Sequence, residues 1–230
     1  MNIDPNRIRR LRRWGFCFAA MGLLAVQVAS AQFAKLDPAS TPSGYLARLL
    51  TNESPFPGER GFVSEADTKA TMLSILWVLH SRMNFVPPGY KQEEIAAIRS
   101  QNILDVITAK NQCEGFFKDA AGKPASSPRV EARIQNLLQI ANSGGKPGRF
   151  ASLLNYVQGL SSSYVKGGIQ EADRFAGLTV VSQVPVTGRA YSWMTGMDYY
   201  NPGGNFVKIP DAHEGLLGGN RFFTLRKEPK

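Results

Sequence analysis

A helix that is too apolar to lie on a protein surface constrains the fold of this chain more than any other sequence feature. It begins at Ser64, an N-cap residue that precedes Glu65 and Asp67 in an acidic first turn. Apolar side chains then cover more than one face of the helix, namely Met72, Leu73, Ile75, Leu76, Val78 and Leu79. A surface helix would carry a single apolar stripe, so we expect a central buried helix from Ser64 to about Arg82.

The same start and stop signals predict further helices on both sides of this segment. Ser127 and Pro128 supply an N-cap and a first-turn proline, and Gly144 ends the helix that they begin. An earlier short helix would place Glu53 at or just past its C-terminal end, with one apolar stripe made of Tyr45, Leu46, Leu49 and Leu50. The other predicted helices span residues 93–99, 103–108, 149–160 and 169–175.

Beyond Gly177 the periodicity changes to short apolar runs separated by glycine, tyrosine and proline. These runs predict strands at residues 178–181, 184–186 and 221–225. The chain has neither an internal repeat nor a low-complexity tract. We therefore expect a mainly α protein with a small C-terminal β part, an α+β fold, with residues 32–230 in a single domain.

The N-terminal residues have the pattern of a secretory signal peptide. Five arginines precede an apolar run over residues 14–28, and Ala29-Ser30-Ala31 follows as a cleavage site. The run is shorter than the roughly 20 residues that span a bilayer. We expect a signal peptide over residues 1–31, export to the periplasm or the medium, and no stable membrane anchor after cleavage.

Cleavage would leave Cys113 as the single cysteine, because Cys17 departs with the signal, so no intrachain disulfide could form. The remaining 199 residues (230 minus 31) are enough to bury a self-sufficient core. The chain carries a formal charge of +9, of which the signal contributes +4 through five arginines and one aspartate, leaving about +5. That surplus suits the anionic polymers of a bacterial envelope, and no basic run is dense enough to indicate nucleic acid. Two separated histidines lack metal-ligand spacing, so no metal or cofactor is expected.

Two carboxylates flank a proline-rich turn just ahead of the central helix. Glu53 and Glu59 stand on either side of Pro55-Phe56-Pro57. Carboxyl groups beside an apolar core can exchange protons with a bound substrate. Two glutamates on one short loop are equally compatible with a solvated turn, so the spacing alone leaves both interpretations open.

Several motifs follow one another along the chain, namely Asn52-Glu53-Ser54, Gly58-Glu59, Leu79-His80-Ser81-Arg82, Val106-Ile107 to Gln112, Tyr199-Tyr200-Asn201-Pro202 and Leu217-Gly218-Gly219-Asn220-Arg221-Phe222-Phe223. In this order they resemble the spore-cortex-lytic type of bacterial cell-wall hydrolase. The resemblance covers about half of the mature chain, in patches. Two departures are Cys113, where the family has an aromatic residue, and Asn220, where it has a terminal histidine. Residues 122–177 have no counterpart and could form an inserted helical lobe.

The resemblance implies a lysozyme-like domain that cuts peptidoglycan glycan strands between N-acetylmuramic acid and N-acetylglucosamine. It implies Glu53 as the general acid that next acts as a base, and Glu59 as a stabilising or water-activating partner. A lytic transglycosylase would use the base step on the muramoyl 6-hydroxyl, and a muramidase would use it on water. The candidate substrate-binding residues are Gln112, Tyr191, Trp193, Tyr199, Tyr200, Asn201 and Asn220, although the aromatic ones are equally compatible with the core of the β part.

Two other functions remain open at the level of sequence. A secreted, cationic helical domain could bind glycan or a partner protein without cutting it. A cysteine endopeptidase would need Cys113 as nucleophile and His213, the only downstream histidine, as its base. His80 lies on the apolar central helix and is interpreted as a core histidine.

Overall fold

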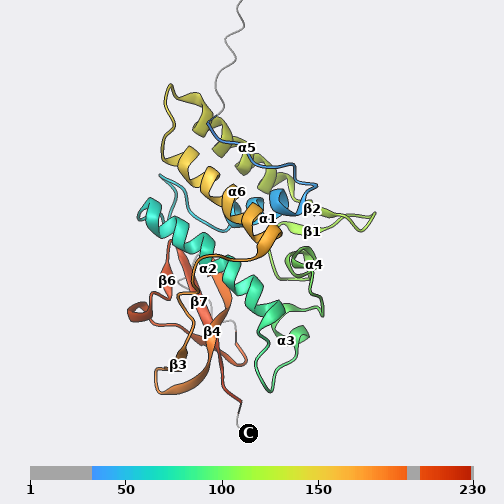
Figure 1. The fold of residues 1–230 in the computed structure, drawn as a ribbon, viewed down its shortest axis with the longest axis vertical. Coiled ribbons are helices and arrows are strands. Elements are labelled where there is room, and N and C mark those ends of the chain that lie inside the picture. Colours follow the sequence, from blue (N-terminus) through green and yellow to red (C-terminus); the bar gives the residue numbers. More distant parts are fainter. Residues whose placement is uncertain (1–32, 196–202, 229–230) are drawn as a thin grey trace, which may run out of the picture. The chain divides into compact units, whose positions relative to one another are not determined.

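The computed structural model describes residues 33–195 and 203–228. These residues belong to one compact unit. It is a mixed fold in which helices precede an antiparallel sheet along the chain (Figure 1), as expected for an α+β protein. The predicted signal peptide lies outside the described residues.

Most of the predicted helices are present, although the one predicted at residues 149–160 runs to Gly167 and the one predicted at residues 93–99 ends at Ala96. The Thr41, Ser64 and Ser127 side chains each accept a hydrogen bond from the first turn of the helix that follows. The helices are α1 (Pro42–Asn52), α2 (Glu65–Asn84), α3 (Gln92–Ala96), α4 (Ile103–Thr108), α5 (Pro128–Ser143) and α6 (Arg149–Gly167), with a short 3₁₀ turn, η1 (Asp211–His213).

The predicted helix at residues 169–175 is wrong. Gly168 ends α6 with a positive φ of 85°, a backbone conformation that favours glycine. The Asp173 carboxylate then accepts from the main-chain N–H of Phe175 at 2.9 Å, which forms a side-chain-stabilised turn in place of a helix. Phe175 is fully buried, so its apolar character reflects packing of the turn onto the core.

The C-terminal part forms a five-stranded antiparallel sheet of order β3-β4-β7-β5, with β6 also paired to β7. Residue Thr195 of β4 lies opposite Asn220 of β7 in the register. A separate two-stranded hairpin, β1 and β2, was not predicted, since three-residue strands carry too little periodicity. The strands are β1 (Phe116–Lys118), β2 (Pro124–Ser126), β3 (Leu178–Val181), β4 (Val184–Thr195), β5 (Phe206–Lys208), β6 (Leu216–Leu217) and β7 (Asn220–Arg226).

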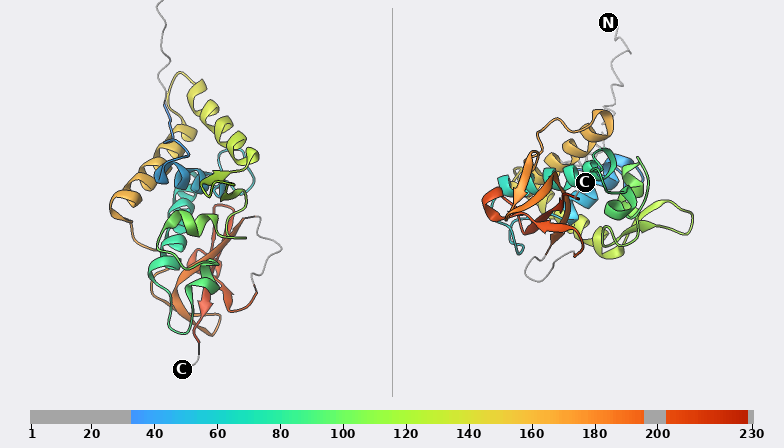
Figure 2. Two further views of the ribbon diagram at one scale, coloured as in Figure 1. Left: turned by 90° about the vertical axis from the view of Figure 1, so that its right-hand side faces the viewer. Right: turned by 90° about the horizontal axis from the view of Figure 1, so that it is seen from below.

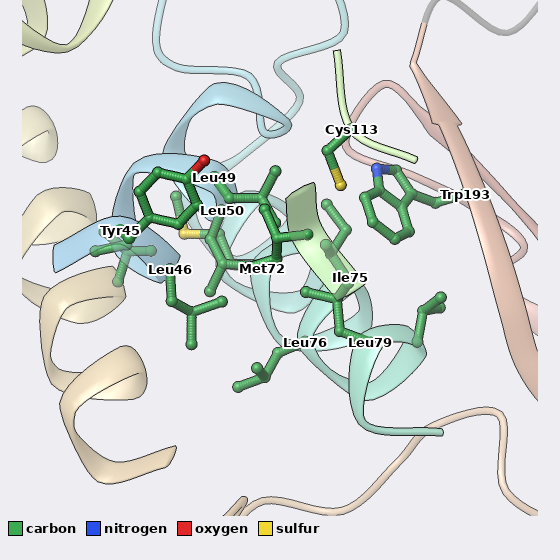
Figure 3. Packing of buried hydrophobic residues seen from close by; sticks show 14 of the residues in the cluster. Tyr45, Leu46, Leu49, Leu50, Met72, Ile75, Leu76, Leu79, Cys113 and Trp193 are labelled. Atoms are coloured by element: carbon green, nitrogen blue, oxygen red, sulfur yellow. The ribbon is translucent and has the colours of Figure 1, made fainter. Parts of the chain in front are cut away.

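Helix α2 is buried between other elements along its length, as predicted. It packs against α1 and α6 and against β4 of the sheet. Its polar residues do not oppose this burial, because the hydroxyls of Thr68, Thr71 and Ser74 each donate to the carbonyl four residues earlier. Figure 3 shows side chains of α1 and α2 interleaved, with Trp193 and Cys113 at one edge of the cluster.

Helices α5 and α6, which lie within the segment expected as an inserted lobe, share this same hydrophobic cluster. Leu153, Leu154 and Val157 of α6 and Ile134 of α5 are fully buried within it. Figures 1 and 2 place α1 and α2 between these two helices and the sheet. The segment 122–177 is therefore part of the main core of the described unit.

Candidate active site around Glu53

Glu53 is fixed at the junction of a helix and the sheet. It is the C-cap residue of α1, and its N–H donates to the carbonyl of Leu49 at 2.9 Å. Its own carbonyl accepts a 2.6 Å hydrogen bond from Nδ2 of Asn220 on β7, a fully buried side chain. The structure thus brings together two residues that the sequence motifs selected independently.

The two oxygens of the Glu53 carboxylate have different surroundings. Oε2 accepts from the indole N–H of Trp193 at 3.2 Å and from the hydroxyl of Thr195 at 3.1 Å. These donors lie two residues apart on β4 and therefore point to the same face of the strand. Oε1 accepts only from the neighbouring Asn52 amide, at 3.2 Å, among the described residues. Oε2 is thus held by the sheet, and Oε1 is the oxygen with capacity for a ligand.

The Thr195 hydroxyl has one proton and two acceptors within reach. Besides Glu53 Oε2, it lies 2.9 Å from Oδ1 of Asn220. An ionised Glu53 attracts the hydroxyl proton, whereas a protonated Glu53 leaves it for Asn220. The Thr195 hydroxyl can therefore donate to either acceptor.

A groove made of two hollows passes on both sides of Glu53. Two adjoining hollows of about 360 and 480 Å³ share four lining residues, Asn52, Glu53, Arg133 and Thr195. The first hollow is also lined by Ser54, Pro55, Glu59, Arg60, Gly61, Gly218 and Gly219. The second is also lined by Gln112, Cys113, Glu114, Arg129, Trp193 and Met194.

One wall of the first hollow consists of main chain. Gly61 and Gly219 have φ values of +89° and +73°, and a Cβ on Gly61 would lie 2.7 Å from the Cα of Gly219. Side chains at either position would force the loop and the β6–β7 turn apart. The close glycine contact therefore keeps the loop after Glu59 against the sheet beside Glu53.

Glu59, the expected partner carboxylate, is fully engaged by the protein. Arg133 donates to both of its oxygens, at 3.0 Å through Nε and at 2.5 Å through Nη2, and the N–H of Phe56 donates to Oε2 at 2.7 Å. The same guanidinium donates to the carbonyls of Thr51 and Ser54 at 2.7 and 3.0 Å. The structure thus places Glu59 as the counter-ion of Arg133 rather than as a second acid or base.

Gln112 lies in the groove with one end of its amide fixed. Its Oε1 accepts from Nη1 of Arg82 at 2.9 Å, and its Nε2 has no hydrogen-bond partner among the described residues. Arg82 is buried, donates to the carbonyl of Tyr191 at 2.8 Å, and lies 5.1 Å from the ring centre of Trp193. Burial lowers the pKa of Arg82 to about 10. Gln112 can therefore offer an oriented amide N–H to a carbonyl group of a ligand.

The described aromatic residues that were expected to stack on sugars, Tyr191 and Trp193, are buried and hydrogen-bonded within the protein. Tyr191 is 1% exposed and donates through its hydroxyl to the carbonyl of Phe85 at 2.7 Å, so it belongs to the core of the sheet. Trp193 is 8% exposed and presents its N–H to Glu53 rather than an open ring face. Asn220, expected to bind substrate, is buried and supports Glu53 instead. Tyr199, Tyr200 and Asn201 lie outside the described residues.

The pair required for a cysteine endopeptidase is not assembled. Burial raises the pKa of the Cys113 thiol, the Glu53 carboxylate raises it further, and Arg82 opposes the rise. His213 lies in η1 and lines a different hollow with Arg174 and Glu214. No histidine lies among the described residues of the hollow that contains Cys113, so the thiol has no base there.

Sequence reasoning missed Asn52, Arg133 and Thr195 as parts of this site. Thr195 follows Trp193 at a spacing of two, which a longer predicted strand would have placed on the same face. Arg133 lies on a helix more than 70 residues after Glu59, and no local pattern relates the two. Only the packing of α5 against α1 brings them together.

No protein-family model, curated protein or solved structure matches this chain. Within residues 33–195 and 203–228, no helix combines the length and apolar character needed to cross a bilayer. In the same part of the chain, no three His, Cys, Asp or Glu side chains are grouped as metal ligands would be.

Proposed function

We propose that this protein is an exported enzyme that cleaves the glycan strands of peptidoglycan, with Glu53 as the acid and base. The observation that carries the proposal is the position of Glu53 in the lining of both adjoining hollows, with one carboxylate oxygen held by Trp193 and Thr195 and the other available to a ligand. The order of the sequence motifs supports a lysozyme-like form of the α+β fold.

The proposed reaction uses one carboxyl group twice, first as a general acid and then as a general base. Glu53 first gives its proton to the glycosidic oxygen, so that the bond to the muramoyl C1 breaks with an oxocarbenium-like charge on the sugar. The resulting carboxylate then takes a proton from the hydroxyl that attacks C1. Thr195 provides a hydrogen bond to the ionised state and turns to Asn220 in the protonated state.

The carboxylates of the groove favour a lytic transglycosylase over a two-carboxylate muramidase. Three glutamates line the two hollows that share Glu53, and two of them pair with arginines, Glu59 with Arg133 and Glu114 with Arg129. Glu53 has no such partner among the described residues. A single carboxyl suffices when the muramoyl 6-hydroxyl attacks, because no second group has to activate water.

The Gln112 amide is a suitable donor for the sugars of this polymer. Both N-acetylated sugars carry an acetamido carbonyl, which can accept from Nε2 of Gln112 while Arg82 fixes the other end of the amide. Arg60 and Arg129 also line the two hollows, and their positive charge suits the carboxylates of the attached lactyl and peptide groups. The proposed substrate is therefore the glycan strand with its acidic substituents.

The test replaces Glu53 by glutamine, which keeps the shape of the side chain but cannot deliver a proton. Release of soluble muropeptides from purified peptidoglycan should fall at least about a hundredfold, the lower range for positioned acid–base groups. Sedimentation with the insoluble polymer should persist. Products of the unchanged protein should be lighter by one water than those of a hydrolase. The matched control is Glu93→Gln, an exposed glutamate on α3.

Turnover by Glu53→Gln equal to that of the unchanged protein would overturn the assignment of the acid. Absence of turnover by the unchanged protein on every peptidoglycan tested would overturn the enzymatic function. Retained sedimentation in that case would identify a module that binds glycan without cutting it.

A further inference from the structure

We infer that Arg133 of α5 is a positioning residue for Glu53, and that its ion pair with Glu59 aligns it for that role. The role in turnover rests on the function proposed above. The inference assigns a part in the site to the helical segment 122–177, for which the sequence offered none.

Arg133 binds the main chain on both sides of Glu53. Its guanidinium makes four hydrogen bonds, two of them to the carbonyls of Thr51 and Ser54. Carbonyls at the C-terminal end of a helix lack partners within the helix, and a cation there also interacts favourably with the helix dipole. Asn220 holds the carbonyl of Glu53 itself. The carbonyls of residues 51, 53 and 54 are thus fixed from two different elements.

Only an arginine can make this set of contacts. Its planar fork has five N–H donors, and the contacts use four of them on acceptors that lie in different directions. A lysine would offer one rotatable ammonium group to the same carboxylate and carbonyls. Glu59 binds two nitrogens of the fork and so sets its orientation toward Thr51 and Ser54.

The hydrogen bonds from Arg133 to the carbonyls of Thr51 and Ser54 determine where the Glu53 carboxylate can lie. The side chain must reach Trp193 and Thr195 on β4 with Oε2 while Oε1 remains in the groove. A movement of residues 51–54 would change both distances. Small misplacements of a reacting group, on the order of 1 Å, can reduce turnover about a hundredfold. Arg133 should therefore affect kcat more than substrate affinity.

The first arm of the test measures turnover of Arg133→Lys and Glu59→Gln on peptidoglycan. Arg133→Lys keeps the charge but loses the fork, and we expect kcat to fall on the order of tenfold or more with KM little changed. The matched control is Glu131→Gln. It removes the charge from another ion pair between α5 and α1, Arg48–Glu131 at 3.5 Å, which lies outside residues 51–59. Its kcat should stay unchanged even where its unfolding midpoint drops.

The second arm does not depend on turnover. The indole N–H of Trp193 donates to Glu53, so its signal in a ¹H–¹⁵N correlation spectrum reports the position of the carboxylate. Arg133→Lys and Glu59→Gln should shift this signal, as Glu53→Gln should, while the indole signal of Trp77, which donates to the carbonyl of Glu171, stays in place. Glu131→Gln should move neither signal.

An unchanged Trp193 signal in folded Arg133→Lys would overturn the inference, whether or not the protein proves to be an enzyme. Unchanged kcat in the same variant, with the unchanged protein active, would also overturn it. Should Arg133→Lys fail to fold, Glu59→Gln decides by the same two measurements.

Discussion

Asn220 on the last strand donates to the main-chain carbonyl of Glu53 at 2.6 Å, although 167 residues separate the two in the sequence. The other end of its amide lies 2.9 Å from the hydroxyl of Thr195, which also reaches the Glu53 carboxylate. One buried side chain therefore contacts both the backbone of the candidate acid and a donor to its carboxylate. The helix end and the sheet form one site through this residue.

Two replacements of Asn220 should lower the stability of the protein to different extents, because alanine only removes a hydrogen-bond donor whereas aspartate also buries a charge. Asn220→Ala leaves the carbonyl of Glu53 without its donor, and we expect a loss of about 1–3 kcal/mol in the free energy of unfolding. Asn220→Asp places a buried carboxylate against that carbonyl, so its loss should be larger. Urea unfolding near neutral pH measures both. Equal stability of Asn220→Asp and the unchanged protein would contradict the hydrogen-bond assignment.

Thr195→Val should impair turnover more than stability. The substitution keeps the shape of an exposed side chain and removes only the hydroxyl that donates to Glu53. A lost hydrogen bond of roughly 1.5 kcal/mol corresponds to about a tenfold fall in kcat. Thr195→Ser keeps the hydroxyl and should retain most activity. Muropeptide release, measured beside the unfolding midpoint, tests this, and equal kcat for the Val and Ser variants would count against a role for the hydroxyl.

Leu76→Ala should be among the most destabilising substitutions in α2. The Leu76 side chain is fully buried between neighbouring elements, and its truncation combines lost burial with a cavity. We expect a cost of about 2–5 kcal/mol in the free energy of unfolding. Leu73→Ala, on the same helix but half-buried, should cost less. Denaturant midpoints compare the two, and equal losses would mean that burial at position 76 does not govern the core.

The fold was predictable where local signals determine it. Ser64 and Ser127 cap the helices that they were expected to begin, and Glu53 lies at the end of α1 as its apolar stripe required. The helix predicted at residues 169–175 is absent because the apolar pattern there does not determine the backbone. There, Gly168 and the Asp173 side chain determine the backbone, and the apolar pattern reflects packing of Phe175 rather than helical periodicity.

The site was predictable only in part, because its contacts are long-range. Glu53 and Asn220 were each selected by a motif, but their contact depends on the approach of α1 to β7. The partnership of Glu59 with Arg133 could not be read from the loop, since it depends on how α5 packs. A carboxylate on a loop looks the same in sequence whether it faces a substrate or an arginine from another helix.

The stability of the protein should fall between pH 7.5 and 5.5 because of His80. Its ring is half-buried among Trp77, Phe85 and Tyr164, and Asn84 Nδ2 lies 3.1 Å from its Nδ1. Burial lowers the pKa of His80, the positive charge of Arg189 lowers it further, and Asp173 opposes the change. In the unfolded chain the pKa returns to about 6.5, so the unfolded state binds more protons in this range.

The contribution of neutral His80 to the free energy of unfolding should accordingly be complete above about pH 6.5. It should be lost as the pH falls through the lowered pKa of folded His80. His80→Gln, which cannot be protonated, should reduce the difference between urea midpoints measured at pH 7.5 and 5.5. The only other histidine in the chain is His213, an exposed residue, so His213→Gln is the matched control and should leave that difference intact. The interval from pH 7.5 to 5.5 lies above the ordinary pKa values of carboxylates, so their titration contributes little to the difference between the urea midpoints. An unaltered difference in His80→Gln, or its disappearance in His213→Gln, would contradict the assignment to His80.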